Sequence, residues 1–399
     1  MPPRRLQPIF IVGQYKCGTT WLLRVLSAHP DVIGVGEIDI VSAACDLKSG
    51  TAVLAPTEER LARFFDKSGW CNCYTPNGWE YTDVVARFQR GESIPMRPWN
   101  RSEPRKFMHL GAEAARTLYD RIAAATTPEQ AMAAFFEAVS TDAEEETHVA
   151  LKAADQISRF RVLQAWQPHA KKIVITRDGR DASISALHFR ELMREAPPGR
   201  GSPAAAGYWK LLQNWADQAD KVIVAAAQGE VYLLRYEDLS NDFAATMQPL
   251  LRWLGLKESQ SLLESIQAQT SFEALTGRPR GTEAKGVMRK GAVGEWRDTL
   301  PPDEQERAWH MAGEQLRALG YTRDGALQPL PDLSSVEEQP YRLQRMLHLE
   351  KELARLRRQL RELQARTSPA TARQKRWPKP IHSIVQAARK LTKHFGRLF

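Results

Sequence analysis

The sequence predicts an α/β fold of three layers, in which a parallel sheet lies between helices, with a helical extension at the C-terminus. Residues 8–13 and 172–176 are short apolar runs of the kind that forms strands buried on both faces. Amphipathic segments, 19–28 and 180–194, follow these runs. Strands that alternate with helices pair in parallel through right-handed crossovers, so ligands are expected at the carboxyl ends of the strands.

The predicted elements alternate along most of the chain. Strands are expected at 8–13, 149–151, 172–176 and 231–234. Helices are expected at 19–28, 57–67, 107–123, 128–140, 180–194, 203–228, 243–254, 259–268 and 302–318. Residues 276–294 carry five glycines and little periodicity, which predicts a mobile lid. We expect a main domain over 1–330, a linker and short coiled-coil helix over 331–367, and a basic linker and amphipathic helix over 368–399.

The composition of the 399 residues is that of a globular protein with an uneven distribution of charge. Residues 340–399 hold 16 Lys and Arg against 3 Asp and Glu, so the net charge of +9 originates in this segment and concerns what it contacts. The cysteines, Cys17, Cys45, Cys71 and Cys73, form neither a disulfide framework nor a metal-ligand pattern. No run approaches the ~20 apolar residues of a membrane span, and the N-terminus lacks a signal-peptide core. We therefore expect a cytoplasmic protein.

The segment after the first strand, Gly13 to Thr20, predicts a phosphate-binding loop. A strand that runs through a glycine-containing loop into a helix aims backbone N–H groups at an anion. The nucleotide-triphosphate pattern GxxxxGK[ST] would place a lysine at Thr19, but here the cation is Lys16. This difference, and the lack of an acidic strand end for a metal, weighs against ATP with magnesium. The alternative is a strand–turn–helix that binds no ligand.

A second strand–turn–helix, over 171–185, has Arg177 at the end of its strand. A guanidinium in this position binds a phosphate through two hydrogen bonds. Ser185 follows two helical turns later and is expected to face the same phosphate. The structural alternative is a surface ion pair between Arg177 and Asp178 or Asp181.

Together these segments resemble the PAPS-dependent sulfotransferases, whose donor is 3′-phosphoadenosine-5′-phosphosulfate. Residues 16–22 resemble the family's 5′-phosphosulfate loop, and Arg177 with Ser185 resembles its 3′-phosphate site. The runs RYEDL at 235–239 and RKGAVGEW at 289–296 resemble its strand-end segment and its lid. The matches fall in order and span about residues 8–320.

The resemblance implies a P-loop NTPase-like sheet core and a donor site without a metal ion, with the desulfated nucleotide PAP as product. It assigns Lys16, Thr19 and Thr20 to the 5′-phosphosulfate, Arg177, Ser185, Arg289, Lys290 and Gly291 to the 3′-phosphate, and Cys17, Gly18, Trp21 and Tyr236 to the donor site as a whole. Cys17 departs from the family, where serine is usual. A thiol is a weaker hydrogen-bond donor than a hydroxyl, but backbone contacts to the donor should survive.

Sulfuryl transfer needs a cation near the leaving oxygen and a base near the acceptor hydroxyl. Lys16 is the candidate cation. The histidine base of the cytosolic members would lie near 152–154, where the sequence is Lys-Ala-Ala. Glu37 resembles the base of the tyrosylprotein and glycan branch, and we predict it here; a solvated or salt-bridged carboxylate is the alternative. The rival bases are His29, His109 and His188, of which His29 and His188 are expected to pack.

The C-terminal extension carries two helical patterns. Apolar residues at heptad spacing predict a short coiled coil within 341–364, which favours a homo-oligomer or a helix folded back onto the domain. They are Met346, Leu349, Leu353, Leu356, Leu360 and Leu363. Residues 381–398 form an amphipathic helix with a basic face, which suits an anionic membrane surface, a partner protein or an acidic face of the main domain. No nucleic-acid-reading motif accompanies the charge.

The sequence therefore predicts an enzyme that moves a sulfuryl group from PAPS to a hydroxyl of a carbohydrate or glycolipid, peripheral on the cytoplasmic membrane face. A small phenolic or natural-product acceptor is the near alternative. A P-loop kinase and a non-catalytic scaffold that acts through its coiled coil are more distant alternatives.

Overall fold

The computed structural model describes most of residues 5–333. The described residues are 5–35, 40–48, 51–62, 64, 86–87, 90, 92, 112–139, 146–153, 157, 160–193, 206–227, 231–284, 288–331 and 333. The chain divides into two compact units, Met1–Pro331 and Asp332–Phe399. The coiled coil predicted within 341–364 and the amphipathic helix predicted at 381–398 lie outside the described residues.

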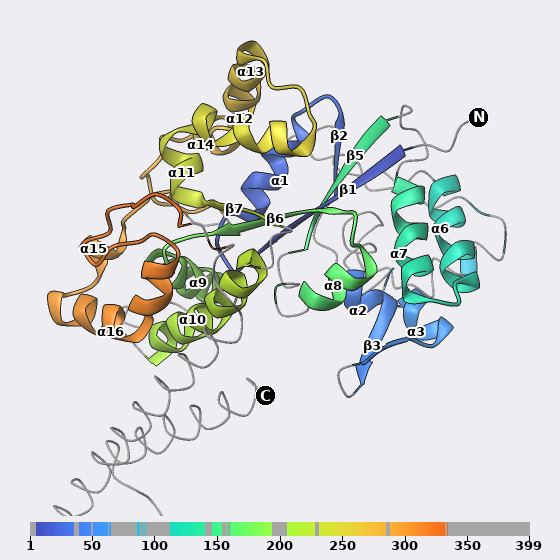
Figure 1. The fold of residues 1–399 in the computed structure, drawn as a ribbon, viewed down its shortest axis with the longest axis horizontal. Coiled ribbons are helices and arrows are strands. Elements are labelled where there is room, and N and C mark those ends of the chain that lie inside the picture. The colour runs from blue at the N-terminus through green and yellow to red at the C-terminus, as the bar shows by residue number, and fades with distance from the viewer. Residues whose placement is uncertain are drawn as a thin grey trace, which may run out of the picture. The chain divides into compact units, whose positions relative to one another are not determined.

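A five-stranded parallel sheet forms the centre of the first unit (Figure 1). Its strands are β1 (Arg5–Gly13), β2 (Val32–Val35), β5 (Glu146–Lys152), β6 (Lys171–Thr176) and β7 (Val231–Arg235), in the spatial order β2-β5-β1-β6-β7. A separate antiparallel pair consists of β3 (Cys45–Lys48) and β4 (Thr51–Leu54). Because β1 lies in the middle of the parallel sheet, the loop that follows it opens between two neighbouring strand ends.

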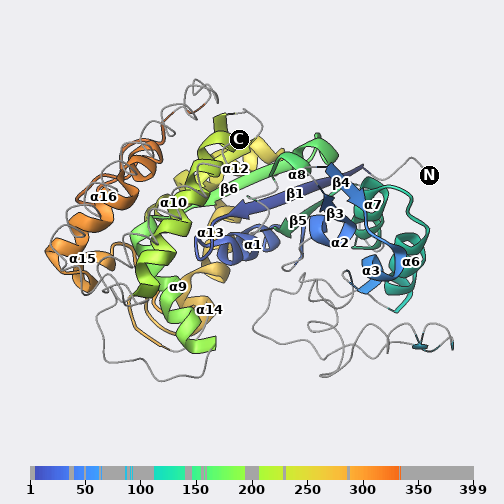
Figure 2. The same ribbon diagram turned by 90° about the horizontal axis from the view of Figure 1, so that it is seen from below.

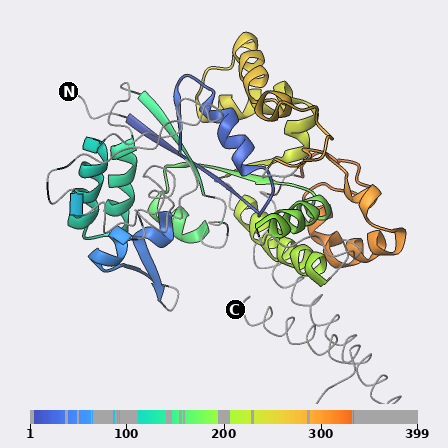
Figure 3. The same cartoon turned by 180° about the vertical axis from the view of Figure 1, so that it is seen from behind.

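Helices connect the strands. They are α1 (Thr19–Ser27), α2 (Ile40–Ala44), α3 (Thr57–Ala62), α6 (Ala112–Ala124), α7 (Pro128–Val139), α8 (Phe160–Trp166), α9 (Gly179–Met193), α10 (Ala206–Ala227), α11 (Tyr236–Asn241), α12 (Phe243–Leu254), α13 (Gln260–Thr270), α14 (Phe272–Thr276), α15 (Trp296–Thr299) and α16 (Pro302–Ala318). Helices α1, α12 and α13 pack on one face of the sheet (Figure 3). Helices α9 and α10 lie on the other face, and α16 packs against α10 (Figure 2).

The alternation of side chains along β1 explains why its sequence is apolar without interruption. Ile9 and Ile11 join the core beneath α1, α12 and α13. Phe10 points to the opposite face, where its ring meets the edge of Phe136 from α7 at 5.6 Å. All three strand residues are fully buried. A strand covered on both faces therefore needs an apolar side chain at every position.

The three-layer prediction is confirmed, and most predicted elements are present within a few residues. The sequence analysis missed β2, which has only four residues and contains Gly34. A Cβ on Gly34 would lie 1.7 Å from Ser27 Oγ, so the close approach of α1 to β2 requires glycine here. In the described part of the chain, no helix has both the length and the apolar character needed to span a membrane.

Candidate functional site

The loop between β1 and α1 has the backbone of an anion-binding turn. Lys16 has φ of 65°, and no other non-glycine residue in the described part of the chain has positive φ. Gly18 follows with φ of 97°. Gly18 is the N-cap of α1 and supplies no side chain to satisfy the N–H groups of the first turn. These N–H groups carry the positive end of the helix dipole, which favours an anion at this position.

Gly18 lies directly against an aromatic ring from the end of β7. A Cβ at this residue would lie 2.6 Å from the Tyr236 ring, so any side chain is excluded. The Trp21 ring meets Tyr236 edge-on at 5.3 Å, and Trp21 Nε1 donates to the carbonyl of Thr270 at 2.8 Å. The structure therefore brings together three of the predicted donor-site residues: Gly18, Trp21 and Tyr236.

Lys16 lies beside aromatic side chains from the loop and from α9. Its Nζ is 4.1 Å from the centroid of the Phe189 ring and 6.0 Å from that of Tyr15. Tyr15 is one of the exposed large apolar residues in the described part of the chain, at 41% exposure. Thr19 is buried, and Thr20 and Ser185 are half-buried. The predicted cation thus lies next to an aromatic surface that solvent reaches.

Arg177 is buried at the end of β6. Its Nη2 donates to the carbonyl of Ala292 at 2.7 Å and lies 3.7 Å from Asp181 Oδ2, and its guanidinium is 4.6 Å from the Tyr236 ring centroid. Burial works to lower the pKa of Arg177, but the negative charge of Asp181, with Tyr236 and Glu237, raises it above the ordinary value. Nε of Arg177 has no hydrogen-bond partner within the described residues. The ion pair with Asp181 is thus present, but it is buried and leaves one buried nitrogen of the guanidinium without a hydrogen-bond partner among the described residues.

The lid segment contacts both Tyr236 and Arg177 through its backbone. Tyr236 Oη donates to the carbonyl of Gly291 at 3.2 Å, beside the Ala292 carbonyl that Arg177 binds. Arg289 and Lys290 both pair with Glu295. Backbone hydrogen bonds from Gly281 to Lys290 and from Ala284 to Arg289 join the two arms of the segment. The described part of the lid is therefore held by a set of specific contacts, and its mobility stays a prediction.

Cys17 is fully buried beneath the loop. Its Sγ donates to Gln14 Oε1 at 3.5 Å, and Thr176 Oγ1 donates to the same oxygen at 2.9 Å. Burial raises the pKa of Cys17 to about 12, against the opposing effect of Arg177. The side chain is therefore a neutral thiol that links the loop to the end of β6.

Two buried carboxylates were missed by the sequence analysis as site residues. Glu237 Oε1 accepts from the backbone N–H of Asp178 and its Oε2 accepts from Tyr321 Oη, both at 2.9 Å. Asp181 accepts from the backbone of Gly294 and Trp296 in the lid. Glu237 directly follows Tyr236, and Asp181 lies four residues after Arg177. Their closeness in sequence to predicted site residues was the signal that could have identified them.

The predicted general base cannot be placed against these groups. Glu37 and the rival base His109 lie outside the described residues. His29 is fully buried, its Nε2 lies 3.1 Å from the Lys257 carbonyl, and its Nδ1 accepts from the backbone of Asp31. His29 therefore packs and fixes a turn, as expected. His188 is half-buried on α9.

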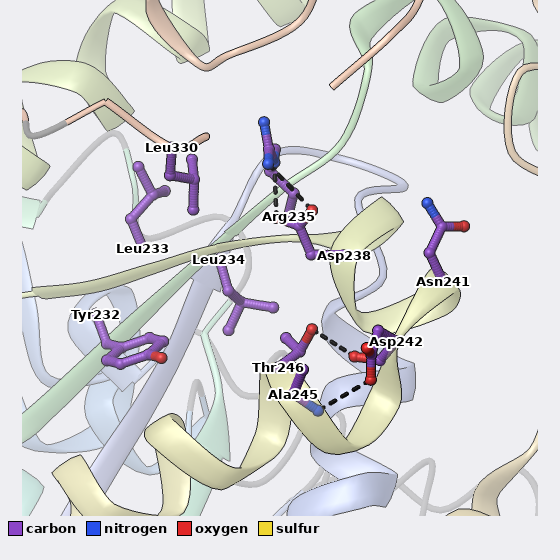
Figure 4. A pocket seen from close by; sticks show the side chains of 10 residues that line it. All are labelled: Tyr232, Leu233, Leu234, Arg235, Asp238, Asn241, Asp242, Ala245, Thr246 and Leu330. Carbon is purple, nitrogen blue, oxygen red and sulfur yellow. Dashed lines mark hydrogen bonds and ion pairs between the residues drawn. The ribbon is translucent and has the colours of Figure 1, made fainter. Parts of the chain in front are cut away.

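A cavity of about 390 Å³ opens beside β7, and none of the predicted donor residues lines it (Figure 4). Its lining is Tyr232, Leu233, Leu234, Arg235, Asp238, Asn241, Asp242, Ala245, Thr246 and Leu330. The charged groups in it are already engaged, because Arg235 binds Asp238 and the carbonyls of Gly320 and Gln328, and Asp242 caps α12. These contacts hold β7, α11, α12 and the segment after α16 together, so we assign the cavity a structural role.

Comparison with known proteins identifies the family. A model of the family described as sulfotransferase domain matches residues 6–320. The chain therefore belongs to the sulfotransferase domain family.

Similar curated proteins include human sulfotransferase 1C2, 24% identical over 164 residues, which cover 36% of this chain and 53% of the relative. Human sulfotransferase 6B1 is 27% identical over 147 residues, which cover 33% of this chain and 46% of the relative. The chain spans about half the length of the curated relatives it matches. Among solved structures, mouse sulfotransferase SULT7A1 complexed with PAP aligns at 16% identity and a TM-score of 0.41, covering 78% of this chain and 84% of that one. The sulfotransferase domain of the Synechococcus PCC 7002 olefin synthase aligns at 16% identity and a TM-score of 0.45, covering 79% and 97%.

Gly18 can be tested against a glycine that shares its backbone but not its surroundings. We expect Gly18→Ala to destabilise the fold by more than Gly255→Ala. Both residues have positive φ, which costs an alanine about 1–2 kcal/mol, but only Gly18 would place its Cβ against a ring. Chemical denaturation followed by tryptophan fluorescence measures both free energies of unfolding. Equal losses in the two variants would show that the contact with Tyr236 imposes no constraint.

Glu237 makes the stability of the protein depend on pH. Burial raises its pKa to about 7 from 4.5, with Arg177 opposing. The folded state therefore holds this proton more tightly than the unfolded state, and the stabilisation present below pH ~4.5 is lost as pH rises through ~7. We expect the free energy of unfolding to fall over this range by on the order of 3 kcal/mol more in wild type than in Glu237→Gln. Parallel urea titrations at several pH values measure it, and identical pH profiles would contradict the assignment.

Proposed function

We propose that this chain is a PAPS-dependent sulfotransferase that transfers a sulfuryl group to an acceptor hydroxyl. One observation carries the proposal. The Lys16 loop, Arg177 at the end of β6, and the lid carbonyls of Gly291 and Ala292 all converge on Tyr236. Three segments that carry predicted cations thus surround one aromatic ring at a helix N-terminus, which supports the binding of a nucleotide that carries one phosphate on its 3′ side and another on its 5′ side.

The residues present fit such a donor. Gly18 supplies no side chain to satisfy the N–H groups of the first turn of α1, and the buried Nε of Arg177 has no hydrogen-bond partner among the residues that the structure describes. In the proposal the 5′-phosphosulfate is held by Lys16, Thr19 and Thr20, and the 3′-phosphate by Arg177, Ser185, Arg289, Lys290 and Gly291. Arg289 and Lys290 exchange their contacts with Glu295 for contacts with the phosphate.

In sulfuryl transfer the protein forms no covalent bond to the group that is transferred, and it acts by positioning the reactants and stabilising charge. The donor supplies the sulfuryl group, whose bond to the phosphate oxygen breaks as the acceptor oxygen bonds to sulfur. Lys16, with the N–H groups of α1, stabilises the negative charge on the leaving side. We propose Glu37 as the base that takes the proton of the acceptor hydroxyl.

We propose a carbohydrate or glycolipid acceptor, reached at the cytoplasmic membrane face through the basic helix predicted at 381–398, with self-association through 341–364.

A specific observation favours the second candidate, a small phenolic acceptor. Tyr15 and Phe189 present an edge-to-face aromatic pair, with centroids 6.1 Å apart, beside Lys16. A planar aromatic acceptor stacks on such a surface, although the apolar face of a sugar also binds aromatic rings.

The donor site is tested by calorimetric titration of PAP without magnesium. We expect PAP to bind wild type, and to bind Arg177→Ala more weakly by about 1.5–3 kcal/mol, because a charged hydrogen bond to the phosphate is lost. Arg252→Ala, which removes an exposed ion pair with Glu258, is the matched control and should bind PAP like wild type. Circular dichroism establishes that each variant is folded. Binding of ATP with magnesium, and not of PAP, by folded wild type would overturn the proposal in favour of a kinase.

The acceptor class is tested by turnover with labelled PAPS on two acceptor panels, one of glycans and glycolipids in vesicles and one of simple phenols. For the glycolipid acceptor we expect activity that pellets with anionic vesicles and falls when residues 340–399 are deleted, because the basic segment would supply the membrane attraction. Full activity of the truncated chain on phenols alone would replace the glycolipid by the phenolic acceptor. PAP binding without turnover on either panel would favour a non-catalytic scaffold.

A further inference from the structure

Asp181 is a buried carboxylate that joins Arg177 to the lid. It lies in the first turn of α9, four residues after Arg177, and only 1% of its surface is exposed. Its Oδ2 accepts from the backbone N–H of Gly294 at 2.7 Å, and its Oδ1 accepts from that of Trp296 at 3.0 Å. Both carboxylate oxygens are therefore used on the lid, and one of them also lies 3.7 Å from Arg177 Nη2.

These contacts close a ring. Arg177 donates to the carbonyl of Ala292, and two residues later the chain donates from Gly294 to Asp181, which in turn faces Arg177. A shift of the lid would break contacts to both side chains at once. The position of the guanidinium and the position of residues 292–296 are therefore coupled through one carboxylate.

The pairing also engages one particular nitrogen of the Arg177 guanidinium. Nη2 is occupied by the Ala292 carbonyl and is the atom nearest to Asp181, whereas Nε has no partner within the described residues. Burial raises the pKa of Asp181, while Arg177 and the two lid N–H groups act to lower it. Asp181 and the Ala292 carbonyl thus hold Nη2, and with it the orientation of the planar guanidinium, while the adjacent Nε is buried without a hydrogen-bond partner among the described residues.

We infer that Asp181 is a positioning residue for the donor: it orients Arg177 toward the 3′-phosphate and holds the lid residues 292–296 in place around it. This inference rests on the proposed function. Asp181 itself contacts the lid and Arg177, so its effect on the donor is exerted through them.

The test compares Asp181→Asn with a second buried aspartate. An asparagine has one carbonyl oxygen for the two lid N–H groups, so one of them loses its acceptor and Arg177 loses its counter-charge. We expect PAP to bind about tenfold or more weakly, and the amides of Gly294 and Trp296 to exchange faster with deuterium. Asp220→Asn is the control, because Asp220 is also buried and accepts a hydrogen bond from Gln315, between α10 and α16. It should lower stability while PAP affinity and lid exchange stay at wild-type values.

The outcomes separate the inference from the proposed function. Wild-type affinity in folded Asp181→Asn, or an equal loss of affinity in Asp220→Asn, overturns the positioning role while the donor site stands. Absence of PAP binding by wild type overturns the proposed function itself. If Asp181→Asn does not fold, Asp181→Glu retains the charge and displaces the carboxylate; weaker PAP binding with faster lid exchange supports the role, and unchanged values for both overturn it.

Discussion

Burial of the Arg177 charge is the constraint on which the site depends. A guanidinium this deep in the protein is tolerated only where opposite charge and hydrogen-bond acceptors surround it. Asp181, the Ala292 carbonyl and the face of Tyr236 meet that requirement, and each comes from a different part of the chain. Balancing one charge therefore brings α9, the lid and the end of β7 together around the loop after β1.

The charged side chains of neighbouring residues are also buried, with ion-pair or hydrogen-bond partners. Arg180 is fully buried, pairs with Asp178 and stacks on the Trp296 ring at 3.7 Å from its centroid. Glu237 accepts hydrogen bonds from the backbone N–H of Asp178 and from the hydroxyl of Tyr321, which follows α16. Single removal of a partner from such a network leaves a buried group uncompensated, so the turn between β6 and α9 has little freedom to move. A rigid turn therefore holds Arg177 in a fixed position relative to the central sheet.

The sequence was sufficient for the parts of the fold that local pattern determines. Apolar runs and helical periodicity located β1, β6 and the helices around them. The pattern is clear in these segments because a strand covered on both faces is apolar throughout, whereas a helix that covers a sheet is apolar on one side. It was insufficient for β2, whose four residues have no clear period, and whose Gly34 is explained only by contact with Ser27. Short strands depend on their neighbours, which a pattern along the chain does not contain.

The same distinction applies to the site. Lys16, Arg177 and the lid were predicted because their residue types and order resemble those of a phosphate site, and the structure brings Arg177 and the lid together. Asp181 and Glu237 were missed because a carboxylate beside a phosphate site opposes the expected charge. The role of Asp181 follows only from its three-dimensional contacts, because it accepts hydrogen bonds from two backbone N–H groups and lies close to the buried Arg177.

Lys16 shows how the loop and this network support each other. A non-glycine residue with φ of 65° costs about 1–2 kcal/mol, and such a conformation persists where the surrounding contacts fix it. The turn from Gln14 to Cys17 is closed by a backbone hydrogen bond, and Gln14 is in turn bound by Thr176 at the end of β6. Thr176 directly precedes Arg177. The strand that carries the buried arginine therefore also fixes the strained lysine, so both ends of the proposed donor are positioned from one strand of the sheet.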